Sequence, residues 1–208
     1  MKTIPVLLAV VGLCAGGGAA ADQHAEHGKM SAEQKQAHHQ DMLQEAINGS
    51  WRSDANKARD AYRHPQQTLD FFGVTPHSKV REIWPGGGWY TEILAPYLAT
   101  QGKLIAAAPA GRGAESMAKR FDANPTLYGK VERANFPTVL GGTGVAPGTA
   151  DVVLTFRNVH NWKMGYMQAE KTDYSEAAFR EIFAMLKPGG VLGIEDHRLP
   201  ESAGAERE

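Results

Sequence analysis

The stretch VREIWPGGGWYTEILAPYL, residues 80–98, decides the predicted fold of this chain. Its apolar run ends at Trp84, is followed by one proline and three glycines, and resumes at helical spacing from Trp89 onward. The pattern predicts a strand, a turn without side chains and a helix, in that order. Such a turn lets a ligand approach the backbone and the free N–H groups of the following helix. Residues 85–88 are therefore interpreted as a ligand cradle, with a simple chain reversal as the alternative.

Strands and helices alternate along the rest of the chain. The predicted strands are 79–84, 102–108, 129–136, 151–156 and 191–196. The predicted helices between them are 89–99, 114–123 and 174–186, the last of which is ended by a KPGG turn at 187–190. This alternation gives parallel pairing through right-handed crossovers. The predicted fold class is α/β: an open, mainly parallel, doubly wound sheet with helices on both faces.

Two short N-terminal helices are predicted ahead of the sheet. The first begins after Ser53 and ends at Pro65. The second places Leu69, Phe71 and Phe72 on an inward face. Both are expected to cover the sheet rather than to form a separate domain.

Composition bounds the size of the domain and the kind of partner. With 208 residues, of which 42% are hydrophobic, one medium-sized domain with a sizeable core is expected. The 22 basic residues are balanced by 23 acidic ones, which gives a net charge of -1. The chain therefore lacks the basic field that would hold nucleic acid or an anionic membrane, and neither is a predicted partner.

The first residues predict export. Lys2 precedes an apolar stretch, residues 4–14, that is too short to span a bilayer, and the alanines at 19–21 offer an A-x-A cleavage site. A signal peptide at 1–21 and a periplasmic or secreted protein are predicted, with an uncleaved anchor as the alternative. The sole cysteine, Cys14, lies within this signal, so the mature chain would hold neither thiol nor disulfide.

A polar segment at 22–49 is predicted to separate the signal from the domain at 50–208. Four histidines lie in it: His24, His27, His38 and His39. No carboxylate or cysteine frame completes a closed metal site around them. The segment is therefore expected to be a solvated tail, and no metal is predicted.

Three motifs of this chain resemble those of a known family. They are IWPGGGWYTE at 83–92, RNVHNW at 157–162, and LKPGGVLG at 186–193 followed by Asp196 and His197. Over residues 45–200 the chain resembles the class I S-adenosylmethionine-dependent methyltransferases, and it looks most similar to an exported subgroup of predicted methyltransferases. The resemblance implies a Rossmann-like fold, S-adenosyl-L-methionine as cofactor and a small-molecule methyl acceptor.

The resemblance also implies a set of cofactor contacts. By this resemblance, Glu82 falls where a carboxylate binds the ammonium group of the cofactor. The glycine turn falls where the backbone approaches the methionine half of the cofactor, and Asn135 and Phe136 fall beside its adenine. Two positions depart from the family pattern: Trp84 replaces its first glycine, and alanines at 106–108 replace the acid that binds ribose. Glu115 is the alternative ribose ligand. The alternative for the other pair is that Asn135 caps a turn and Phe136 lies in the core. The predicted cofactor-binding residues are Glu82, Pro85, Gly86, Gly87, Gly88, Asn135, Phe136, Arg157 and Asn158.

Three residues are predicted to act on the methyl acceptor. His160 is the candidate general base, because an imidazole titrates near neutrality, and it is needed only where the acceptor must lose a proton. Tyr90 and Trp162 are predicted to shape the acceptor pocket. The alternative is that Asn158 and His160 only tie loops together, which is also the favoured interpretation of Asp196 and His197.

Two other functions compete with methyl transfer. The missing ribose acid and the export signal are also consistent with a non-catalytic module that binds a small ligand. A nicotinamide-dependent oxidoreductase would need a G-x-G-x-x-G turn and an acidic residue about 20 positions later, which the chain lacks. The ending RLPESAGAERE stops where the family continues with a helix and an antiparallel hairpin, so the domain is predicted to be incomplete and to lack this hairpin.

Overall fold

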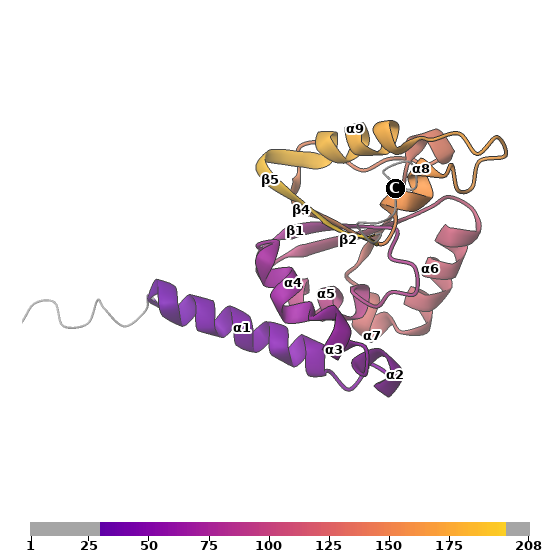
Figure 1. Ribbon diagram of the computed structural model, residues 1–208. Coiled ribbons are helices and arrows are strands. Elements are labelled where there is room, and N and C mark those ends of the chain that lie inside the picture. The colour runs from indigo at the N-terminus through magenta and orange to yellow at the C-terminus, as the bar shows by residue number, and fades with distance from the viewer. Residues whose placement is uncertain (1–29, 199–208) are drawn as a thin grey trace, which may run out of the picture.

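The computed structural model describes residues 30–198, and a parallel five-stranded sheet lies at its centre (Figure 1). Its strands are β1 (Lys79–Ile83), β2 (Lys103–Ala108), β3 (Glu132–Asn135), β4 (Ala150–Phe156) and β5 (Leu186–Glu195). They lie in the order β3-β2-β1-β4-β5, and every neighbouring pair is parallel. The order reverses between β1 and β4, so a crevice opens beyond the carboxyl ends of these two strands.

Helices cover both faces of the sheet, which confirms the predicted doubly wound α/β fold. On one face lie α1, α4, α5, α6 and α7, and on the other lie α8 and α9 (Figure 1). The helices are α1 (Ala32–Asn48), α2 (Asp54–Lys57), α3 (Asp60–Arg63), α4 (Pro65–Phe71), α5 (Thr91–Leu98), α6 (Arg112–Ala123), α7 (Pro125–Tyr128), the 3-10 helix η1 (Thr138–Leu140), α8 (Val159–Lys163) and α9 (Ser175–Met185). No helix of the described part is long and apolar enough to cross a bilayer.

The strands are apolar on both faces because each face is covered. Residues at alternate positions, such as Leu104 and Leu154, pack toward α5 and α1. Their neighbours, such as Val153, pack toward α8 and α9 with Trp162 and Ile182. The continuous apolar run of β4 reflects this two-sided burial.

Helix α5 contains Pro96 and is joined to the N-terminal helices at that point. A proline has no N–H to donate to the carbonyl four residues earlier, which here belongs to Glu92. The Nε1 of Trp51 donates to that carbonyl instead, at 2.8 Å. The side chain of Glu92 accepts from Arg52 Nε at 2.7 Å and from Asn56 Nδ2 at 3.0 Å. A helix that contains a proline is thus completed by long-range contacts.

The predicted solvated tail is a helix from residue 32 onward, and the prediction of solvation is wrong for its buried end from residue 43. Ser31 and Gln34 form a capping box that begins the 17-residue helix α1. Leu43, Ala46 and Ile47 are buried, and α1 packs against α5. The spacing of these three residues is helical, but charged and polar neighbours outnumber them. The predicted signal peptide, His24 and His27 lie outside the described residues.

Two smaller predictions are also wrong. Residues 187–190 belong to β5, where they form a bulge rather than a turn. In the ladder between β4 and β5, Ala150 pairs with Leu186 and Val152 pairs with Val191, so residues 187–190 have no paired residue in this ladder. Gly189 has a φ of 77°, a value that glycine adopts easily, and this carries the extra residues out of the ladder. Phe71 is 84% exposed, because the buried residues of its helix are Pro65 and Leu69 on another side. Within residues 30–198, β5 is an edge strand.

Candidate functional site

The glycine turn lies at the end of β1, in the crevice, and its backbone faces open space. The N–H of Gly88 donates to the carbonyl of Pro85 at 2.8 Å and closes the turn. Gly86 and Gly88 have φ values of 55° and 79°, which favour glycine. A Cβ added at Gly86 or Gly87 would meet no other atom within 4 Å. Other exposed glycines are equally open, but Gly86 and Gly87 also line two cavities at the switch point of the sheet.

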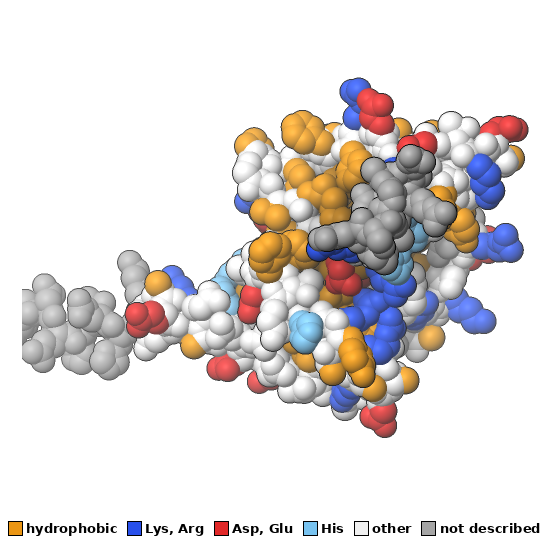
Figure 2. Space-filling view, in the orientation of Figure 1, with side chains coloured by type: hydrophobic (Ala, Val, Ile, Leu, Met, Phe, Trp, Pro, Cys, Tyr) orange, Lys and Arg blue, Asp and Glu red, His pale blue; other side chains and the backbone are white. Residues whose placement is uncertain are grey.

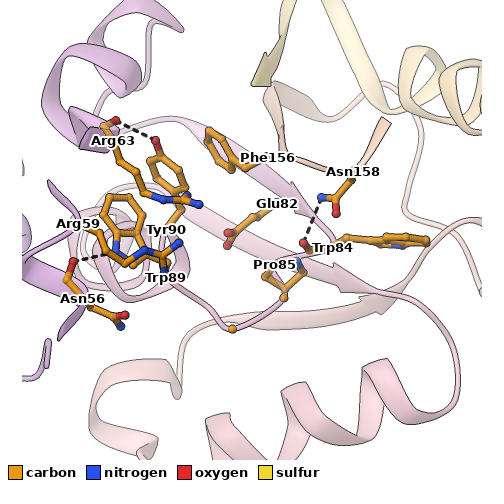
Figure 3. Close-up of a pocket in the computed structure, with 12 residues that line it drawn as sticks. Asn56, Arg59, Arg63, Glu82, Trp84, Pro85, Trp89, Tyr90, Phe156 and Asn158 are labelled. Carbon is orange, nitrogen blue, oxygen red and sulfur yellow. Dashed lines mark hydrogen bonds between the residues drawn. The ribbon is translucent and has the colours of Figure 1, made fainter. Parts of the chain in front are cut away.

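Two cavities flank the turn and share Trp84, Pro85, Gly86, Gly87 and Asn158. The first, here the arginine cavity, has a volume of about 210 Å³ (Figure 3). It is further lined by Asn56, Arg59, Arg63, Glu82, Trp89, Tyr90 and Phe156. The second, here the β2 cavity, has a volume of about 600 Å³. It is further lined by Ala108, Pro109, Gly113, Ser116, Met117, Arg120, Asn161 and Tyr166.

A buried carboxylate lies beneath the turn, on β1. Glu82 is 2% exposed and its Oε2 accepts from Thr91 Oγ1 at 2.6 Å. Burial raises the pKa of Glu82 to about 7, although the hydrogen bond from Thr91 and the charge of Arg120 act in the opposite direction. The side chain also lines the arginine cavity. A cation bound in this cavity could therefore contact the Glu82 carboxylate, whose hydrogen-bond donor among the described side chains is Thr91.

Trp84 links β1 to the other side of the sheet. Its φ of 53° is rare for a bulky residue, and this is the position where the resemblance places a glycine. The indole Nε1 donates to the carbonyl of Phe136 at 2.8 Å, and the ring meets Trp162 edge-on at 6.0 Å. Asn158 Nδ2 donates to the carbonyls of Ile83 and Trp84, at 3.2 and 3.3 Å. These contacts hold the strained end of β1 that begins the turn.

Arg120 on α6 fixes the turn from its other side. Its Nη1 donates to the carbonyl of Gly86 at 2.9 Å, and the same atom would lie 3.1 Å from a Cβ on Gly88. The turn is thus held by its flanks while its open side stays free.

A third cavity, here the outer cavity, has a volume of about 430 Å³ and contains no residue of the glycine turn. It is lined by Arg59, Tyr62, Arg63, Arg157, Glu195, Asp196 and His197. Asp196 Oδ1 accepts from His160 Nδ1 at 2.7 Å, and Arg157 Nη2 lies 3.1 Å from His197 Nε2. Burial acts to raise the pKa of Asp196, but hydrogen bonds from His197 and His160 lower it overall.

The side chains of His160, Asp196 and His197 lie close enough together to hold a metal ion. A guanidinium already contacts His197 Nε2, however, and His160 occupies one oxygen of Asp196. A cation would have to displace both partners, so the described contacts do not favour a metal here.

Comparison with known proteins identifies the fold. No family model matches the chain, and no curated protein matches it. A methyltransferase from Aquifex aeolicus that depends on S-adenosylmethionine has a TM-score of 0.54 and 17% identity, over 71% of each chain. The 4+2 cyclase SpnF has a TM-score of 0.54 and 14% identity, over 84% of this chain and 64% of its own. The chain has a methyltransferase-like fold. It spans less than two thirds of the cyclase, and no match supports the exported subgroup.

Most residues predicted for the turn meet in this methyltransferase-like fold. Those that line the arginine cavity are Glu82, Pro85, Gly86, Gly87, Tyr90 and Asn158. Gly88 supports the turn from behind, and Arg157 lies in the outer cavity. His160 lines none of the three cavities, so its role as a general base stays a prediction.

Four other residues predicted for the site of the methyltransferase-like fold lie away from it. Trp162 and Phe136 are both 0% exposed and pack in the core behind Trp84, so neither walls a cavity. Asn135 ends β3 without reaching the β2 cavity. Glu115 is exposed, and no carboxylate of the described residues lines the β2 cavity.

Sequence reasoning predicted helices in the segments that complete the site but missed the site residues that they carry. Arg59 and Arg63 come from the N-terminal segment, and Met117 with Arg120 comes from α6. The four-residue spacing of the two arginines places them on one helical side, which was the available signal. Their partners across the cavity, Trp89 among them, are fixed only by how the helices dock.

Replacing Glu82 with glutamine is expected to stabilise the protein at alkaline pH. The pKa of Glu82 rises from 4.5 when unfolded to about 7 when folded, so stability is lost as the carboxyl ionises between these values. At pH 8 the free energy of unfolding of Glu82→Gln should exceed that of the wild type by roughly 3 kcal/mol, and the gain should shrink toward pH 5. Urea denaturation across this range measures it. Glu132→Gln on the exposed edge is the control, and a gain that does not grow with pH would contradict the prediction.

Proposed function

We propose that this protein is an S-adenosylmethionine-dependent methyltransferase that acts on a small-molecule acceptor. The observation that carries the proposal is the open turn at Gly86 and Gly87, which lies at the switch point of the sheet between two cavities. A cofactor along this turn would reach both cavities. The methyltransferase-like fold supports the same assignment at the level of fold alone.

The residues present fit the methionine half of this cofactor. Glu82 offers a buried carboxylate for an ammonium group, and the side-chain-free turn lets the backbone come close. On the other side, Pro109, Met117 and Tyr166 give the β2 cavity apolar surface for a nucleoside. Ser116 and Asn161 are its candidate partners for ribose hydroxyls. Neutral groups would thus take the place of the carboxylate that the resemblance implies.

Methyl transfer requires mainly that the acceptor atom is aligned with the methyl group and that water is excluded from the cavity. The bound cofactor supplies an electrophilic methyl carbon on a sulfonium sulfur. Tyr90 and Phe156 are stacked at 3.6 Å and form a rigid wall that can position an acceptor beside the turn. Proximity in such a pocket supplies most of the rate gain for a displacement of this kind. His160, held by Asp196 beside the outer cavity, stays the candidate base for an acceptor that loses a proton, although it lines none of the three cavities.

A second candidate function is a non-catalytic module that binds a small ligand in the same crevice. The observation that favours it is the β2 cavity, where no carboxylate of the described residues is placed to hold ribose. Such a module would use the same turn without transferring a methyl group.

One experiment tests the cofactor and the proposed export together. The full-length chain is expressed in a bacterium and recovered from the periplasm, where its mass is expected to match a chain that begins at Asp22. Calorimetry with S-adenosylmethionine and with S-adenosylhomocysteine should then give micromolar dissociation constants. No binding at millimolar cofactor would overturn the methyltransferase and favour the binding module. Retention of residues 1–21 would overturn the predicted cleavage alone.

A further inference from the structure

Three arginines surround the indole of Trp89, but only one has anionic partners. The guanidinium carbons of Arg52, Arg59 and Arg63 lie 5.1, 5.9 and 4.9 Å from the ring centroid. Arg52 is ion-paired with Asp60 and Glu92, at 2.7 Å each. Within residues 30–198, the guanidinium groups of Arg59 and Arg63 make no ion pair, and both lie near the face of Trp89.

Arg59 and Arg63 lie close enough for the charge of Arg59 to lower the pKa of Arg63. Burial, together with the charge of Arg59, lowers the pKa of Arg63, while Glu195 acts in the opposite direction. Glu195 is not ion-paired with it, and its Oε2 accepts from the Tyr90 hydroxyl at 3.3 Å. Two cations held together without a direct ion pair make a site where an added anion lowers the energy, even with the carboxylates of Glu82 and Glu195 in the adjoining walls. Figure 2 shows basic side chains gathered near the middle of this face.

The walls beside these arginines are flat and apolar. Tyr90 and Phe156 are stacked with an interplanar angle of 14°, and Trp89 meets Tyr90 edge-on at 4.6 Å (Figure 3). A planar molecule can lie along such a wall while its charged end reaches the guanidinium groups. The cavity of about 210 Å³ suits a small molecule rather than a polymer.

We propose that the arginine cavity binds the methyl acceptor, and that this acceptor is a small planar molecule with a carboxylate held by Arg59 and Arg63. The inference rests on the proposed function and names its substrate class. Both arginines also line the outer cavity, which does not reach the glycine turn. The anion therefore lies on the entrance side, away from the backbone where the cofactor would be held.

The test uses a charged probe and its neutral counterpart. Para-hydroxybenzoate and para-hydroxybenzamide differ in the carboxylate alone, and ligand-observed NMR measures their binding to the mature protein without cofactor. We expect the benzoate to bind and the amide to bind at least tenfold more weakly. Arg59→Gln and Arg63→Gln should each weaken the benzoate about tenfold or more. Arg180→Gln, an exposed arginine on α9, is the matched control and should change nothing.

Calorimetry with S-adenosylhomocysteine separates this inference from the alternatives. If both arginine variants bind it as the wild type does, the arginines serve the acceptor. If its affinity falls tenfold while benzoate binding is unchanged, the arginines hold the cofactor's carboxylate and the proposal is overturned. Equal binding of benzoate and amide would also overturn it. If the protein binds benzoate but no cofactor, the anion site would be supported and the proposed methyltransferase function would be overturned.

Discussion

Gly87→Val is expected to remove cofactor binding while leaving the fold intact. Gly87 lines both cavities, and a Cβ built on it would meet no atom within 4 Å. Its backbone does not adopt the left-handed region, unlike that of Gly86 and Gly88, so its φ is one that a residue with a side chain can adopt. The added methyl groups would fill the space above the turn that the cofactor needs. We expect the affinity for S-adenosylhomocysteine, measured by calorimetry, to fall roughly a hundredfold or more.

The control for this variant is Ala177→Val, which places the same valine side chain at an exposed position of α9. Both variants should unfold at the wild-type urea concentration, within the small range usual for surface changes. Wild-type affinity in a folded Gly87→Val protein would show that the ligand does not lie on the turn. The proposed function would then lose the observation that carries it.

The sheet and its glycine turn could be predicted because their signals are local. The strand, turn and helix around residues 80–98 follow from apolar spacing and from glycine within a single stretch of chain. The turn then fell at the crevice because parallel strands end at one edge of the sheet. Glu82 could be placed on the same grounds, since alternation along β1 fixes the face on which it lies.

The rest of the site depends on contacts that no local pattern encodes. Phe136 and Trp162 are aromatic residues beside predicted strand ends, a placement that fits a pocket wall and a core equally well. The structure puts both in the core, because Trp162 packs edge-on against Phe136 and against Trp84, which turns toward them. Arg59 and Arg63 reach the cavity only because their helices dock on α5. That docking is a tertiary event between residues about 40 positions apart.

Arg52→Met is expected to destabilise the protein more than any surface change, because Arg52 joins three helices. Its side chain is 0% exposed. It is paired in bidentate fashion with Asp60 on α3, bound to Glu92 on α5, and donates to the carbonyl of Ile47 near the end of α1. Methionine fills similar space but leaves the buried Glu92 carboxylate without its main partner. The free energy of unfolding, measured in urea, should fall by about 3–5 kcal/mol.

The matched control is Arg180→Met, which breaks an exposed pair on α9 and should cost less than about 1 kcal/mol. Adding Glu92→Gln to Arg52→Met should recover part of the loss, because it removes the charge that the first change leaves uncompensated. Benzoate binding should weaken in Arg52→Met, since α3 begins directly after Arg59, ends at Arg63 and is held on α5 through this network. A loss below about 1 kcal/mol with unchanged benzoate affinity would mean that apolar packing alone docks these helices.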